Sequence, residues 1–196
     1  NENLKTIFDL LFQRIKPAFK QVRTMERAKQ LAYGFLTCTG RATITSMLIA
    51  VGQQFKDWTA AYRLFWGERM STNTLFEEVT KVSLEQLSPS QMIVIHMDDT
   101  VIRKTGKAIP GTGWKRDPLG PAFHTNLIWS QRFIQTSISL PGDCLHSQSR
   151  STPIDFYHAP SVKKPGKRAT VEDMQEFKEQ RKKHNMSIVG LNRLKE

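Results

Sequence analysis

Hydrophobic residues recur every three or four positions through the first 87 residues, which is the spacing of one face of a helix. The spacing predicts helices over residues 4–15, 25–36, 44–51 and 58–65. Pro17 is expected to end or kink the first of them. Thr74 followed by Glu77 has the sequence of a capping box and predicts the start of a fifth helix. We therefore expect residues 1–87 to form a helical N-terminal domain.

The pattern changes after the turn-forming residues 88–90. Residues 92–97 form a nearly continuous apolar run rich in β-branched side chains, which predicts a buried strand. Gly and Pro are frequent in residues 104–121, which predicts a loop. Alternation then predicts strands over 124–129 and 132–140, joined at Ser130-Gln131. A second domain, residues 91–196, is therefore expected to contain a sheet.

The C-terminal third has weaker signals. Residues 142–168 are basic and without periodicity, which predicts irregular structure. Thr170 and Asp173 predict a capped helix that extends to about His184, and residues 186–196 have only a weak apolar pattern. The fold class expected for the whole chain is α+β or α/β.

The charge of the chain favours a polyanionic partner. The net charge is +11, with +4 in residues 1–90 and +7 in residues 91–196, so the excess does not come from one tail. Nucleic acid is the first expectation and an anionic membrane surface the second. A basic protein without such a partner remains the alternative. A helix–turn–helix arrangement around Gly40, with basic residues nearby, raises the expectation that residues 1–87 also contact DNA.

Cysteine usage and apolar run length bear on the compartment. Cys38 and Cys144 are too few for a disulfide framework or a four-cysteine zinc site, so a reducing, cytoplasmic and nucleoid-associated location is expected. The longest apolar run, residues 47–51, is too short to span a bilayer. The sequence does not begin with Met, which favours a piece of a longer protein.

Asp98-Asp99-Thr100, directly after the predicted strand at 92–97, is the strongest candidate for chemistry. Carboxylates next to an apolar strand are costly unless they have partners, metal or water. A carboxylate on a rigid strand end suits Mg²⁺, which binds one or two carboxylates together with substrate phosphate oxygens. Such ions activate water in phosphodiester cleavage. A turn or helix cap is the alternative explanation of the same three residues.

Three segments carry a resemblance to a known family. VIHMDDTVIRKTGK (94–107) and HTNLIWSQRFIQTSISLP (124–141) resemble the start of the catalytic domain of DDE-type transposases of bacterial insertion sequences. DWTAAYRLF (57–65) resembles the helical N-terminal segment of the same proteins, and the resemblance covers most of residues 25–140. It implies an RNase H-like mixed sheet, in which the first catalytic Asp ends the first strand and the next two strands form a hairpin.

The resemblance also implies an activity and site residues. Asp98 matches the first metal-binding carboxylate and is the catalytic candidate. Asp99 is the less favoured ligand, because neighbouring side chains on an extended chain point to opposite faces. The implied cofactor is Mg²⁺ or Mn²⁺. The implied partners are double-stranded transposon ends and target DNA, with a homodimer on paired ends and no membrane. The implied reactions are phosphodiester cleavage and strand transfer.

DNA-binding residues are inferred from charge rather than from the family. They lie just beyond the acidic pair and around an aromatic residue in the basic loop: Arg103, Lys104, Lys107, Trp114, Lys115 and Arg116.

The chain departs from the family in one large respect, because the second Asp and the Glu of the motif are not recognisable. One carboxylate cannot position two ions, so this chain alone is not expected to cut DNA efficiently. A non-catalytic DNA-binding remnant of a truncated mobile element is the alternative, and a basic structural or membrane-surface protein a more distant one.

Overall fold

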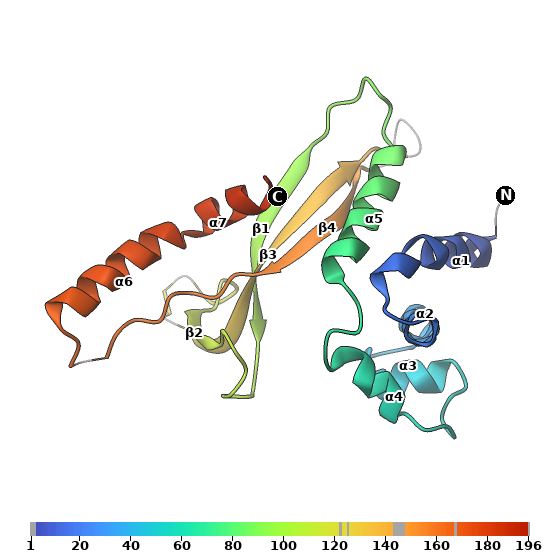
Figure 1. Ribbon diagram of the computed structural model, residues 1–196, viewed down its shortest axis with the longest axis horizontal. Coiled ribbons are helices and arrows are strands. Elements are labelled where there is room, and N and C mark those ends of the chain that lie inside the picture. The colour runs from blue at the N-terminus through green and yellow to red at the C-terminus, as the bar shows by residue number, and fades with distance from the viewer. Residues whose placement is uncertain (1–2, 122, 125, 143–147, 167, 196) are drawn as a thin grey trace. The chain divides into compact units, whose positions relative to one another are not determined.

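The computed structural model describes residues 3–121, 123–124, 126–142, 148–166 and 168–195. These residues form seven α-helices and a four-stranded antiparallel sheet, which confirms the α+β expectation. The chain divides into two compact units, Asn1–Leu84 and Glu85–Glu196 (Figure 1), which are described separately below. The division falls close to the boundary expected at residues 88–90. Cys144 lies outside the described residues.

The first unit is helical, and its helices lie close to the predicted ranges. Its core has two clusters, one around Leu31, Leu48 and Leu64 and the other around Phe12 and Met25. Leu31 and Leu48 lie at apolar positions of the helical repeats, whereas the predicted face of the first helix is only partly buried, because Leu4 is 83% and Ile7 48% exposed. The elements are α1 (Leu4–Arg14), a 3₁₀ turn (Lys16–Ala18), α2 (Val22–Thr37), α3 (Ile44–Ala50), α4 (Thr59–Tyr62), a 3₁₀ turn (Arg63–Phe65) and α5 (Thr72–Glu85).

The start of the fifth helix differs from the prediction. Ser71, rather than Thr74, caps α5, because its Oγ accepts a hydrogen bond from the backbone N–H of Thr74 at 3.1 Å. Thr74 lies inside the first turn, where its Oγ1 is 2.9 Å from the Oγ of Ser71. The predicted capping box at Thr74–Glu77 is therefore wrong, and Ser71 is the residue whose side chain satisfies an orphan amide of the helix start.

The second unit is built on one long central strand. β3 (Leu127–Leu140) pairs antiparallel with β1 (Ile95–Arg103), β2 (Gly113–Arg116) and β4 (Arg150–His158). All pairings among the described strands are antiparallel, so the expected mixed sheet does not appear in this part of the chain. Figure 1 shows β1, β3 and β4 side by side. After β4 the chain continues into α6 (Val171–Lys183) and α7 (Met186–Arg193).

Four strand predictions need correction. The apolar run at 92–97 is not a buried strand, because β1 starts only at Ile95 and its first five residues are exposed. The strands expected at 124–129 and 132–140 are one continuous strand, since Ser130 and Gln131 are both paired with β1. β2 lies inside the loop expected at 104–121, and β4 inside the region expected to be irregular.

The buried face of the sheet faces α7. Ile134 and Ile138 of β3 are almost completely buried. On the same face, Gly190 of α7 lies against the end of the Met97 side chain, so α7 contacts β1 here. The capping box of α6 forms as predicted, with Thr170 and Asp173 exchanging both hydrogen bonds. Met97 of β1 thus lies on the face of the sheet that carries Ile134 and Ile138, and the opposite face carries the candidate site.

Candidate functional site

Asp98 lies inside β1 rather than at the end of a strand, which corrects the expected position. It is paired with Gln135 of β3, and the strand continues to Arg103. The residue is exposed. Its Oδ1 accepts a hydrogen bond of 2.8 Å from the backbone N–H of Asp99. A carboxylate in mid-strand is tolerated here because its face of the strand is open to water.

The face that carries Asp98 is polar, with one aromatic stack. Because side chains alternate along a strand, His96 and Thr100 share this face with Asp98. The His96 Nε2 lies 2.6 Å from the Ser139 Oγ on β3. Phe133 and Phe156 stack on the same face at 4.7 Å between ring centroids. The arrangement offers one free-standing carboxylate beside hydroxyl, amide and imidazole groups.

Asp99 points to the opposite face, as expected for an extended chain. Its Oδ2 accepts a hydrogen bond from the Nε of Arg132 at 2.7 Å and lies 2.5 Å from the Nη2 of the same residue. A guanidinium bound in this way already compensates the charge of the carboxylate. Asp99 is therefore tied to β3 and is a weaker candidate ligand than Asp98. Arg132 was not predicted as a site residue. Its only distinguishing feature in the sequence is a positive charge within an apolar strand.

Two other carboxylates of this unit have structural partners. Asp155 binds the Nε and Nη2 of Arg193 at 2.9 and 3.1 Å, and Asp173 caps α6. The described residues contain no group of three or more His, Cys, Asp or Glu side chains able to hold a metal ion. Asp98 therefore belongs to no such group in the part of the chain that the structure describes.

The basic candidates divide between the two faces of the sheet. Arg103 ends β1, and Lys104 and Lys107 follow it in the loop. Trp114, Lys115 and Arg116 lie in β2 rather than in a loop, which corrects the expectation. The register places Trp114 opposite Trp129, so Trp114 and Arg116 share the face of Asp98. Asp98 pairs with Gln135 and Trp114 with Trp129, which are six residues apart on β3. Asp98 and Trp114 are therefore roughly 20 Å apart along the strand.

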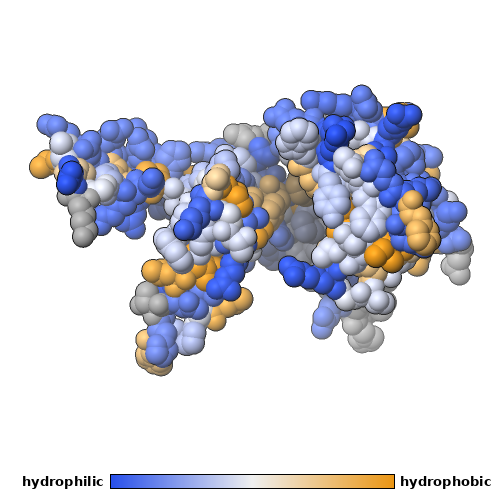
Figure 2. All heavy atoms as spheres, turned by 90° about the horizontal axis from the view of Figure 1, so that it is seen from below, coloured by the Kyte–Doolittle hydropathy of each residue, from blue (hydrophilic) through white to orange (hydrophobic). Residues whose placement is uncertain are grey.

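Lys115 is less available than its neighbours. It lies on the opposite face, and its Nζ donates to the Ser161 Oγ at 3.3 Å. Burial lowers the pKa of the Lys115 amine below its ordinary value, and the positive charge of Arg132 lowers it further. Trp114, by contrast, is 67% exposed and packs edge-on against Trp129. Hydrophilic side chains cover much of the surface seen in Figure 2, with hydrophobic side chains exposed among them.

The comparisons with known proteins give one family. A family model described as DDE superfamily endonuclease matches residues 14–184, which is more than half of the chain. No curated protein and no solved structure matches the chain significantly. No helix among the described residues has both the length and the apolar character needed to cross a membrane.

Proposed function

The chain belongs to the DDE superfamily endonuclease family, and from this premise we propose that it is part of a DNA transposase in which Asp98 binds a divalent metal ion. The observation that carries the proposal is the exposed carboxylate of Asp98 within β1. Its neighbour Asp99 is already compensated by Arg132. One of the two adjacent carboxylates is thus left for a ligand.

The residues around Asp98 fit one ligand position of Mg²⁺ or Mn²⁺. These are hard cations that accept one carboxylate and complete their shell with water and substrate phosphate oxygens. A bound ion would polarise the scissile phosphate and lower the pKa of an attacking water. Asp98 would orient that ion from a rigid strand, since β1 is paired with β3 along its whole length.

The basic residues would hold DNA along the same unit. Arg116 and Trp114 lie on the face of Asp98. Arg103 ends β1, and Lys104 and Lys107 follow in the loop. Cations in this arrangement would neutralise successive phosphates and give salt-dependent affinity. Binding to transposon ends, strand transfer into target DNA, an RNase H-like fold and a homodimer on paired ends all belong to the same proposal.

Asp98→Asn should lower the affinity for Mn²⁺ at least about tenfold. The loss of a metal ligand should weaken binding no less than the loss of a residue that hydrogen-bonds to a ligand. Affinity for duplex DNA should stay unchanged within a factor of about two, since the basic residues remain. Calorimetric titration of Mn²⁺ and fluorescence anisotropy with labelled duplex measure the two quantities.

The matched control is Asp99→Asn, which removes the same charge from the opposite face. It should leave Mn²⁺ affinity near that of the wild type and lower stability instead, because Arg132 loses its partner. Equal Mn²⁺ binding by wild type and Asp98→Asn would sink the metal proposal and favour the non-catalytic DNA-binding remnant.

The 196-residue chain alone should not nick supercoiled plasmid above the rate of Asp98→Ala when Mg²⁺ is present. The reason is that efficient cleavage requires further carboxylates to position two ions, and no such group exists among the described residues. Gel assays of nicked plasmid over time measure the rates. Robust Mg²⁺-dependent nicking that disappears in Asp98→Ala would contradict this expectation.

A further inference from the structure

The helical unit contains a hollow lined by aromatic rings and cations. Its volume is ≈ 760 Å³, and it lies along the segment that leads into α4 and the 3₁₀ turn after it. The rings are those of Trp58, Tyr62 and Trp66, and the cations are Lys56 and Arg63. The hollow is shallow and open to solvent.

Hydrogen bonds to the protein fix two of the three rings. The Nε1 of Trp58 donates to the carbonyl of Gln53 at 2.8 Å. The hydroxyl of Tyr62 lies 3.0 Å from the Thr45 Oγ1. With their polar atoms bonded to the protein, these rings form a preorganised wall, which lowers the entropic cost of binding a planar partner.

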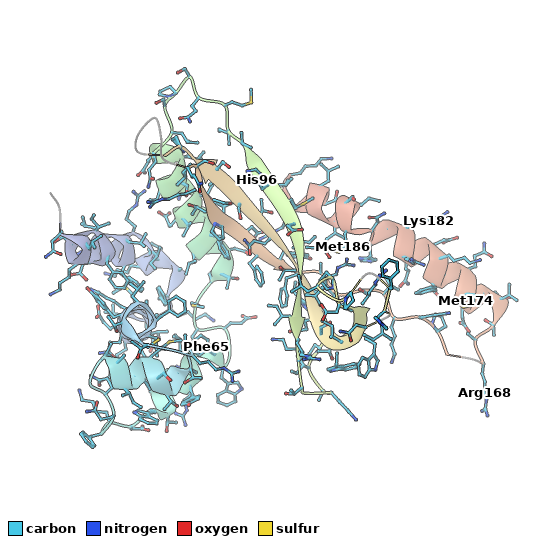
Figure 3. The ribbon with its side chains drawn as sticks, turned by 180° about the vertical axis from the view of Figure 1, so that it is seen from behind. Phe65, His96, Arg168, Met174, Lys182 and Met186 are labelled. Atoms are coloured by element: carbon cyan, nitrogen blue, oxygen red, sulfur yellow. The ribbon has the colours of Figure 1, made fainter. Side chains whose placement is uncertain are left out.

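The third ring and its surroundings are strongly exposed. Trp66 is 74% exposed, Phe65 62% and Phe55 93% (Phe65 is labelled in Figure 3). Three exposed aromatic side chains within twelve positions of sequence are unusual for a surface without a partner. Of the three, Trp66 lines the hollow, so its exposed ring is available to a partner there.

The charges of the hollow decide the kind of partner. Lys56 and Arg63 supply two positive charges, and Asp57 supplies one carboxylate. Asp57 is used within the protein, because its Oδ1 accepts the backbone N–H of Thr59 at 2.9 Å. Hydrogen bonds to Thr59 are the main cause that lowers the pKa of Asp57. Binding of an apolar partner would remove water from both cations and leave them unpaired, which is costly. The phosphates of a nucleic acid would instead form ion pairs with them.

We propose that this aromatic hollow binds an unpaired base of single-stranded DNA, which stacks on Trp66 while Lys56 and Arg63 contact the flanking phosphates. Aromatic stacking combined with a cationic track is how proteins bind single strands without reading their sequence. The proposal concerns the helical unit alone and does not depend on metal binding by Asp98.

The test compares a fluorescent oligothymidylate with an abasic strand of the same length, which keeps the phosphates and lacks the bases. The 196-residue wild-type chain should bind the oligothymidylate more tightly than the abasic strand, as measured by anisotropy. Trp66→Ala should lower affinity for the oligothymidylate about tenfold, within the range for losing one stacked base, and leave the abasic strand unaffected. Lys56→Gln should weaken both equally.

The matched control is Phe35→Ala, which removes an aromatic ring of similar exposure (60%) from α2, away from the hollow. It should leave both affinities unchanged. Equal binding of the two strands by the wild type, or no loss in Trp66→Ala, would overturn the proposal. A dimer in sedimentation that dissociates in Trp66→Ala would also overturn it, because a second copy of the chain would then occupy the surface.

Discussion

Replacing Arg103, Lys104, Lys107 and Arg116 together by Gln should lower affinity for duplex DNA about a thousandfold at about 0.15 M salt. Each phosphate contact contributes roughly 0.9 to the slope of log affinity against log salt, so the removal of four cations that each neutralise one phosphate should reduce the slope by about 3.6. All four side chains belong to β1, β2 or the loop between them. Anisotropy titrations of a labelled duplex at several salt concentrations measure both the affinity and the slope.

A variant with the same change of charge provides the control. Four cations in the C-terminal half of α6 are replaced by Gln: Lys178, Arg181, Lys182 and Lys183. Cations in the last helical turn already interact favourably with the helix dipole and water. This variant should change the salt slope by less than about one. Equal losses in the two variants would mean that net charge alone drives binding, and the proposed DNA path across the sheet unit would be abandoned.

The helices were predictable because each buries one face. The apolar positions of residues 4–15, 25–36 and 44–51 recur at helical spacing, and several of them pack into the two clusters of the first unit, while Leu4, Ile7 and Phe35 stay exposed. The start of α5 was not predictable from a motif search, since Ser71 and Thr74 both carry suitable hydroxyls. Only the observed hydrogen bond identifies Ser71 as the cap.

The strands were harder to predict because their partners are distant in sequence. Ser130-Gln131 has the composition of a turn, yet pairing with both β1 and β2 keeps Ser130 in a continuous strand. Residues 150–158 lie in a basic stretch without periodicity, so no strand was predicted there. In the structure Pro153 lies opposite Ser137 at a register shift of the β3–β4 pair, which is where a sheet tolerates proline.

The candidate site was only partly predictable. An acidic pair inside an apolar stretch drew attention to Asp98, and alternation predicted that Asp98 and Asp99 point apart. The partner of Asp99 is separated from it by 33 positions, so only the β1–β3 register reveals Arg132. The mid-strand position was missed because a buried strand would have excluded carboxylates, whereas this part of β1 is exposed.

The location of the core provides the second large prediction, because the apolar run at 92–97 and strand β3 are competing candidates for it. Ile138 is 1% exposed and Met92 is 82% exposed. Ile138→Ala should lower the free energy of unfolding by about 2–5 kcal/mol, since it removes buried methyl groups and leaves a cavity. Met92→Ala should change it by less than about 0.5 kcal/mol. Amide hydrogen exchange of β3 measures the sheet unit separately from the helical unit. A larger loss of stability in Met92→Ala than in Ile138→Ala would place the core in residues 92–97. Asp98 would then follow a buried strand, and a carboxylate there would need a partner.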